Sequence, residues 1–383
     1  MTIAEILSNE DLRRDQFPVA RDKVFLAHAG VCPLPGRVAE AVAHAARDST
    51  LDDQETAIPP TLIRETRQLS ARLLGCQPEE IALVGPTSLG LSLIANGLPL
   101  RKRDNVIIYS DDYPSNVYPW MALAGKGVEV RMLNLKQLGR IRAADVLGQV
   151  DEQTRLVALA SCHFLSGWRI DLKSIGEGLR QRNILFCVDG IQTLGAFPTG
   201  VEHVDFLAAD SHKWLLGPVG AGILYVKRDL QEKLRPSVLG WHNVHSPGFV
   251  AQETMEFRTD ARRYEAGSAN LLGIAGLRAS LQLVLELGID SIADELLRKR
   301  AWLVPALRAR GWEILQADAP PEHASAILSL HHVDEDLTAL HAKLLAAGIV
   351  TSLRTDRPGR KYLRLSPHFY NTDAELQRVV EML

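Results

Sequence analysis

Short runs rich in Val, Ile and Leu recur between residues 64 and 226, separated by stretches with helical spacing. They read NVIIYS, VEVRML, TRLVALAS, ILFCVDG, VDFLAAD and GILYV. Such regular alternation of strand-like and helix-like segments is typical of α/β folds. Because the runs are almost continuously apolar, we expect helices on both faces of the sheet, and therefore a mainly parallel sheet.

A different pattern follows the GSANLLG segment. Long helices are predicted over about residues 271–310, followed by strand, helix, two strands and a last helix, which indicates a smaller α+β unit. The length of 383 residues also exceeds what one core usually organises. We assign residues 22–265 to a large domain and residues 1–21 with 266–383 to a small one, with a ligand cleft between them.

Charge and cysteine usage exclude several function classes. The net charge is −3, from 43 Lys plus Arg and 46 Asp plus Glu, so nucleic acid is not an expected partner. The four cysteines lack CxxC spacing, which predicts no metal site and no disulfide framework. Acidic residues near the start argue against a signal peptide, and proline and polar residues interrupt the uncharged stretch 81–100. We therefore expect a cytoplasmic protein without a membrane partner.

Two charged residues, Asp189 and Lys213, follow predicted strands of this sheet. Ligands of open parallel sheets bind at the carboxyl ends of the strands, so both side chains are expected at one crevice. Pyridoxal 5′-phosphate (PLP) needs a lysine for its aldehyde, an acid for its pyridine nitrogen and a dipolar cup for its phosphate. The GPTSLGLSL segment, which follows a strand-like run and begins a helical pattern, could supply the cup. The alternatives are a surface lysine and an ordinary helix cap.

Several motifs, taken in order, resemble those of the class V aminotransferase superfamily, which includes cysteine desulfurases, kynureninases and isopenicillin N epimerases. YSDDYPSNVYPW resembles EHHxNxxPW, VDGIQ resembles VDGAQ, and RRYEAGSAN resembles RFEAGTPN; FLAHAGVCPLP is similar to the opening strand and turn. The resemblance runs from Phe25 to the C-terminus. It implies the PLP-dependent aspartate-aminotransferase-type α/β fold, with a mainly parallel central sheet in the large domain and a smaller α+β C-terminal domain. It also implies a homodimer with shared active sites.

The resemblance carries roles for individual residues around the ring of PLP. Lys213 falls at the Schiff-base position, Asp189 at the pyridine nitrogen and Gln192 at the phenolic oxygen. Tyr113 falls where many relatives stack a histidine on the ring; a core tyrosine is the alternative. His163 lies where relatives place an amide near the cofactor oxygen or the substrate, and a buried core histidine is the alternative there.

The phosphate site departs from the family pattern at one position. The usual serine three residues before the lysine is Asp210 here, with Ser211 beside it. Because a carboxylate repels a phosphate, we expect Asp210 to turn away or to bond a backbone donor while Ser211 replaces the serine. Which of the two faces the phosphate is left open. The other phosphate ligands that the resemblance implies are Thr87, Ser88, His212 and the partner subunit's Ser268.

The substrate side of the site depends on arginines near the C-terminus. Arg364, in YLRLSPHFYNT, matches the family arginine that grips the substrate carboxylate, and a guanidinium suits that task. Arg354 either supports the same loop or is the next candidate. Desulfurases carry a cysteine on the loop before this arginine, but residues 355–361 read TDRPGRK and contain none.

The expected reaction follows from that missing cysteine. A persulfide-forming desulfurase is disfavoured, and the first expectation is a carbon–sulfur lyase that acts by β-elimination on a cysteine derivative. The alternatives are an aminotransferase, then an amino-acid epimerase, and, in a different class, a non-catalytic ligand-binding protein of the same fold. The sequence does not define the substrate side chain.

Overall fold

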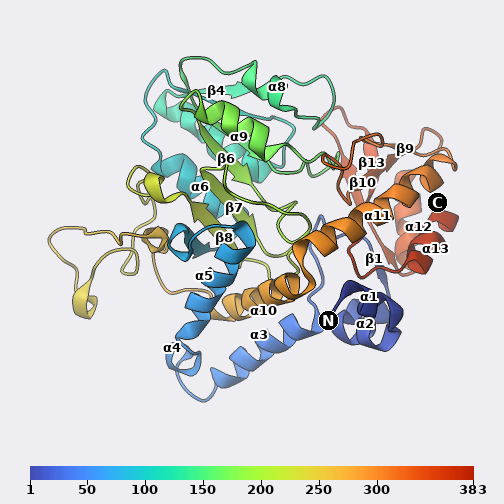
Figure 1. Ribbon diagram of the computed structural model, residues 1–383, viewed down its shortest axis with the longest axis horizontal. Helices are drawn as coiled ribbons and strands as arrows, with labels where there is room; N and C mark the ends of the chain where they lie inside the picture. Colours follow the sequence, from blue (N-terminus) through green and yellow to red (C-terminus); the bar gives the residue numbers. More distant parts are fainter.

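A seven-stranded sheet forms the centre of the protein in a computed structural model that describes residues 1–383 (Figure 1). The strand order is β2-β8-β7-β6-β5-β3-β4. All neighbours from β7 to β4 are parallel, whereas β8 is antiparallel to both β7 and β2, so the predicted mainly parallel sheet is confirmed. The strands are β2 (Ile81–Val84), β3 (Asn105–Ile108), β4 (Glu129–Met132), β5 (Thr154–Ala160), β6 (Leu185–Asp189), β7 (Phe206–Asp210) and β8 (Gly222–Val226).

Both faces of this sheet are covered, as the continuous apolar runs predict. In β6, Phe186 and Val188 pack into one core, and Cys187 between them packs into the other. Helices α5 (Thr61–Leu74), α9 (Leu172–Arg180) and α10 (Leu271–Leu287) contribute to the first core. The second core is built by α6 (Thr87–Gly97) and α7 (Tyr118–Met121).

A separate four-stranded antiparallel sheet, of order β12-β13-β10-β9, forms the smaller unit with its own core. Its strands are β9 (Glu313–Ile314), β10 (Leu328–His331), β12 (Ser352–Thr355) and β13 (Lys361–Leu365). Its helices are α11 (Ile289–Arg308), α12 (Leu337–Ala346) and α13 (Asp373–Met382). The sequence predicted the later strands and helices but missed the two-residue strand β9.

The domain boundary at residue 266 remains a prediction, and two elements pack against the unit to which the sequence did not assign them. Helix α10 packs against α3 (Gly36–Asp48) and α5, which belong to the expected large domain. Strand β1 (Val24–Phe25) pairs instead with β11 (Ile349–Val350) of the small unit. The remaining helices are α1 (Ile3–Ser8), α2 (Glu10–Gln16), α4 (Gln54–Ala57) and α8 (Ala143–Leu147).

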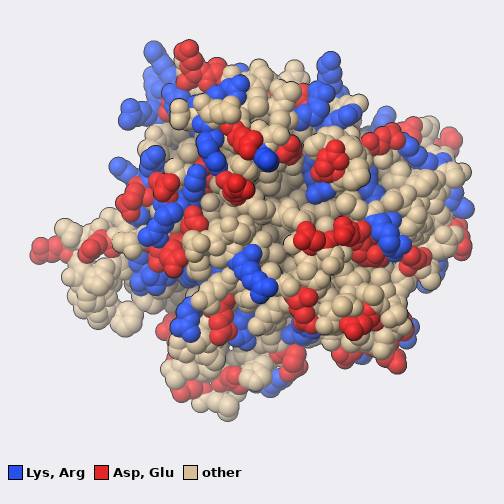
Figure 2. Space-filling model, in the orientation of Figure 1, with Lys and Arg blue, Asp and Glu red and all other residues tan.

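No single helix has the length and apolar character needed to cross a membrane; α10 and α11 would qualify by length and composition only as a pair, and they meet at a 75° bend. The surface mixes both signs of charge on the face drawn in Figure 2, with neither sign forming one continuous field. A loop that carries the short 3₁₀ helix Pro247–Phe249 projects from the body of the protein (Figure 1).

Candidate active site

A pocket of about 260 Å³ lies where the carboxyl ends of the central strands meet the small unit. Asp189 ends β6, Lys213 follows β7, and Thr87 begins α6, so three separate crossovers bring these residues to one place. The small unit contributes Arg354 and Arg364. The predicted residues that line the pocket are Thr87, Ser88, Tyr113, Asp189, Gln192, His212, Lys213 and Arg364.

Lys213 is the only lysine that lines the pocket, and 7 % of its surface is exposed. Burial lowers the pKa of its amine below the ordinary value. The nearby charges of Arg364 and Arg354 lower this pKa further, whereas the charge of Asp189 raises it. Its Nζ lies 5.2 Å from the centroid of the Tyr113 ring. Tyr113 is 45 % exposed, which argues against the alternative of a core tyrosine. The amine therefore lies beside an accessible aromatic face.

Asp189 is buried, and its Oδ1 accepts a hydrogen bond from the Ile191 amide at 3.0 Å. Burial and the charge of nearby Asp112 raise the pKa of Asp189 above its usual range. A carboxyl in this state gains from a cationic partner, which a protonated pyridine nitrogen would be. Asp112 was missed from the sequence; burial raises its pKa to about 6, although it accepts hydrogen bonds from Asn116 and two backbone amides.

The start of α6 presents free donors to the pocket. Pro86 occupies the cap position, and no side chain caps the helix. The backbone amides of Thr87 and Ser88 have no hydrogen-bond partner within the protein, so they can bind an anion at the positive end of the helix dipole. Thr87 Oγ1 accepts the Asp210 amide at 2.9 Å and retains its own hydrogen for donation.

The Asp210–Ser211 pair is arranged differently from one part of the prediction. Asp210 bonds backbone donors, as expected: Oδ1 accepts the Ser211 amide at 2.7 Å and Oδ2 the Gly220 amide at 3.0 Å. The Ser211 hydroxyl, however, donates to Pro218 O at 2.7 Å, and Ser211 does not line the pocket. The Ser211 side chain is thus bound to the following turn, and its expected role as the replacement for the missing serine remains a prediction.

Two other predicted residues have their polar atoms engaged elsewhere. His163 does not line the pocket, and its ring nitrogens contact Ser166 Oγ at 3.1 Å and Asp111 O at 2.9 Å. Burial lowers the pKa of His163 to about 4, as is typical of a core histidine, and its role near the cofactor remains a prediction. Gln192 stays at the pocket; its Nε2 donates to Ala29 O at 3.1 Å, which leaves its second amide hydrogen for an oxygen of a ligand.

Arg364 and Arg354 converge at Gly30. A Cβ on Gly30 would lie 3.7 Å from Nη2 of Arg364 and 3.6 Å from Nη2 of Arg354. Arg364 is 1 % exposed; its Nη1 donates to Phe164 O at 2.7 Å, while Nε and Nη2 are buried without a partner. Burial and the Arg354 charge lower the pKa of Arg364 to about 9. Buried, unpaired guanidinium donors of this kind are well suited to an anionic ligand.

The loop between β12 and β13 consists of residues 356–360. Arg357 on this loop forms an ion pair with Asp111 and also donates to Ser110 O, which ties the small unit to the end of β3. None of the four cysteines lines the pocket. The sequence did not predict the contact of Arg357 with Asp111, because this contact depends on how the two units pack.

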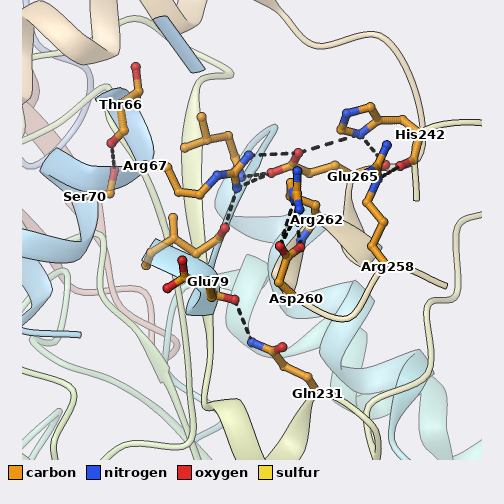
Figure 3. Close-up of polar contacts among 12 residues, drawn as sticks. Thr66, Arg67, Ser70, Glu79, Gln231, His242, Arg258, Asp260, Arg262 and Glu265 are labelled. Atoms are coloured by element: carbon orange, nitrogen blue, oxygen red, sulfur yellow. Dashed lines mark hydrogen bonds and ion pairs between the residues drawn. The ribbon is translucent and has the colours of Figure 1, made fainter. Parts of the chain in front are cut away.

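Ser268 lies outside the pocket in its own chain, on an exposed segment. The segment is anchored by Glu265, which pairs with Arg67 at 2.7 Å and accepts the Leu83 amide at 2.8 Å (Figure 3). Both partners of this ion pair are about nine-tenths buried, with side-chain exposures of 10 % and 9 %. A contribution of Ser268 to the partner's site remains a prediction.

The profile of the aminotransferase class-V family matches residues 35–379. The chain belongs to the class V aminotransferase family. A probable cysteine desulfurase of Methanothermobacter thermautotrophicus is 29 % identical over 98 % of this chain and 98 % of the relative. The uncharacterized aminotransferase YcbU of Bacillus subtilis is 26 % identical over 81 % of this chain and 80 % of its own.

Solved structures show the same fold. The apo cysteine desulfurase of Thermococcus onnurineus superposes with a TM-score of 0.89 at 21 % identity, covering 97 % of this chain and 96 % of the other. The complex of the cystine C–S lyase C-DES with its product cysteine persulfide gives 0.87 at 23 % identity, covering 96 % and 98 %. This class V aminotransferase is thus a PLP-dependent enzyme of the expected fold.

The pocket of this class V aminotransferase fits PLP on its own chemistry. Lys213 offers a buried amine, Asp189 a carboxyl that gains from a cation, and α6 two unpaired amides for a phosphate. The orphaned Nε and Nη2 of Arg364 suit the carboxylate of an amino acid. These groups surround one pocket, so cofactor and substrate would meet there.

Proposed function

We propose that this class V aminotransferase is a carbon–sulfur lyase that releases sulfur from a cysteine derivative by β-elimination. The observation that carries the proposal is the absence of any cysteine from the pocket and from residues 355–361. β-Elimination needs one group for proton transfer and no protein nucleophile for sulfur. Lys213 is that group.

The cysteines have the properties of structural residues. Burial raises the pKa of Cys32 to about 12 and that of Cys162 to about 11. Burial also raises the pKa of Cys76 to about 12, and it raises the pKa of Cys187, inside β6, well above its ordinary value. A thiol must ionise to accept sulfur as a nucleophile, so none of these four is suited to the persulfide step.

The roles of the other residues follow from their positions. When bound, PLP supplies an electron sink for negative charge at the substrate's Cα. Lys213, whose amine pKa burial lowers to about 8, would bind the cofactor's aldehyde and, once the substrate amine has displaced it, would take the Cα proton. Asp189 would pair with the pyridine nitrogen, and Arg364 would bind the carboxylate and so orient the substrate relative to Lys213. Thr87, Ser88 and His212 hold the phosphate.

The names of the relatives favour reactions other than β-elimination. The relative from Methanothermobacter carries the name cysteine desulfurase, so the sequence-based exclusion of that reaction is not confirmed. YcbU carries the name aminotransferase, which keeps transamination as the second candidate. The three reactions differ in their products, which makes the choice experimental.

A panel of amino acids tests the proposal. The purified enzyme is incubated with L-cystine, S-methylcysteine and L-alanine, each with and without a keto acid. We expect pyruvate and ammonia in equal amounts from the sulfur compounds and no dependence on the keto acid. Consumption of the keto acid would establish an aminotransferase instead, and loss of optical rotation of alanine an epimerase.

We further propose that the enzyme is a homodimer in which the partner subunit's Ser268 reaches the phosphate. Exposed apolar side chains lie on the neighbouring segment that projects from the body, among them Trp241, Phe249 and Met255 at 40 %, 77 % and 64 % exposure. Such a group of exposed apolar residues is typical of an interface. Sedimentation of dilute enzyme should show a dimer, and a fully active monomer would contradict the shared site.

A further inference from the structure

The end of β7 holds a contact between a carboxyl group and an imidazole behind the expected phosphate site. Asp210, where the family pattern has serine, has a side chain with no exposed surface, and its Oδ2 lies 2.9 Å from Nδ1 of His212. His212 lines the pocket together with Thr87 and Ser88. The imidazole therefore lies between a buried carboxylate and the place where a phosphate is expected.

The carboxylate of Asp210 is held by the backbone. Its two carboxylate oxygens accept the amides of Ser211 and Gly220, at 2.7 and 3.0 Å. Backbone donors that bond a carboxylate favour its charged form. An ionised carboxylate accepts hydrogen bonds and donates none.

The contact with Asp210 restricts which protons His212 carries. Nδ1 is buried and has no aligned hydrogen-bond partner, and the acceptor beside it is Asp210 Oδ2. The contact is favourable only when Nδ1 bears a proton. No protein group bonds Nε2, which is left for a ligand.

A phosphate on the other side completes the restriction. A neutral imidazole with its proton on Nδ1 has an acceptor at Nε2, and phosphate oxygens are also acceptors. Only the imidazolium can donate to Asp210 and to a phosphate oxygen at once.

We propose that Asp210 is a positioning residue that holds His212 as the imidazolium, so that its Nε2–H binds the phosphate of PLP. The carboxylate replaces the hydroxyl that the family serine would offer directly, and the charge of His212 separates it from the phosphate. The inference rests on the proposed placement of the phosphate at Thr87, Ser88 and His212. It adds that Asp210 acts through His212 alone.

The test compares PLP with pyridoxal, which has no phosphate. Dissociation constants of both are measured by absorbance titration of the full-length apo enzyme for the wild type, Asp210→Asn, His212→Gln and the double variant. We expect Asp210→Asn to weaken PLP roughly tenfold, because a charge-assisted bond becomes a neutral one. Pyridoxal affinity should stay unchanged. In the His212→Gln background, Asp210→Asn should cost nothing further.

Each other result overturns a defined part of the argument. If His212→Gln leaves PLP affinity intact, the phosphate placement itself fails. If His212→Gln weakens PLP but Asp210→Asn does not, only the role of Asp210 fails. The same factor from Asp210→Asn in both backgrounds, or an equal loss for pyridoxal, would make Asp210 merely structural. Asp210→Ala, which removes the same charge and adds no hydroxyl, is the second variant and should weaken PLP in the same way; thermal unfolding of each apo protein checks that it folds.

Discussion

Replacement of Arg364 by lysine tests how the pocket holds an amino-acid substrate. The wild-type guanidinium divides its donors: Nη1 bonds Phe164 O at 2.7 Å, while Nε and Nη2 are buried and free for a carboxylate. A lysine keeps the charge but has a single ammonium, which cannot match both acceptors of a carboxylate and also reach Phe164 O. A hydrogen bond to a charged group contributes about 1.5–3 kcal/mol. The loss of one such bond predicts a roughly ten- to hundredfold weaker substrate.

The assay is a spectral titration of the PLP-loaded enzyme with S-methylcysteine, followed by steady-state kinetics. Arg364→Lys should raise the apparent dissociation constant by that factor and leave the cofactor absorbance before titration unchanged, because Arg364 is assigned to the substrate. Arg354→Lys is the matched control; its parent side chain is partly exposed, and we expect a smaller effect. Intact substrate affinity together with loss of the cofactor band would refute the carboxylate role.

Three further predictions concern residues around and beyond the pocket. His28 is buried and bonds Tyr370 at 2.8 Å, and burial lowers its pKa from 6.5 to about 4. The unfolded chain therefore binds a proton that the native state refuses, and stability is lost as pH falls from 6.5 towards 4, at up to about 1.4 kcal/mol per pH unit. His28→Gln should flatten the free energy of urea unfolding against pH in that range; an unchanged slope would count against the neutral histidine. Glu265→Gln leaves Arg67 buried opposite a neutral amide and should cost about 3 kcal/mol of unfolding free energy, so an unchanged denaturant midpoint would contradict the pairing. Arg357→Gln removes an exposed contact between the units and should raise KM about two- to fivefold at low salt with kcat preserved, whereas a fall in kcat alone would assign Arg357 to the chemistry.

The sequence predicted the parts of this site that depend on strand ends. Asp189 and Lys213 follow apolar strands, and parallel connections bring such ends to one edge, so their meeting follows from topology. The unpaired amides at the start of α6 follow in the same way from a strand, a Gly-Pro turn and a helix.

Side-chain direction within loops was not predictable in this way. The Ser211 hydroxyl turns to Pro218 O because the glycine-rich turn folds back, with the Gly217 amide bonded to Ser211 O. His163 lies next to Phe164, which lines the pocket, but the imidazole of His163 is hydrogen-bonded to Asp111 O on a neighbouring loop. These partners are set by the packing of loops and units, for which local sequence patterns carry no signal.

Product analysis with L-cysteine and L-cystine tests the central claim most directly. A lyase that relies on Lys213 without a cysteine nucleophile converts the carbon skeleton to pyruvate and the amino group to ammonia, and releases sulfur in a small molecule. We therefore predict pyruvate as the carbon product, no alanine, and no added sulfur in the intact mass of enzyme quenched during turnover. Alanine as the carbon product, with sulfur bound to one of the four cysteines, would contradict the account.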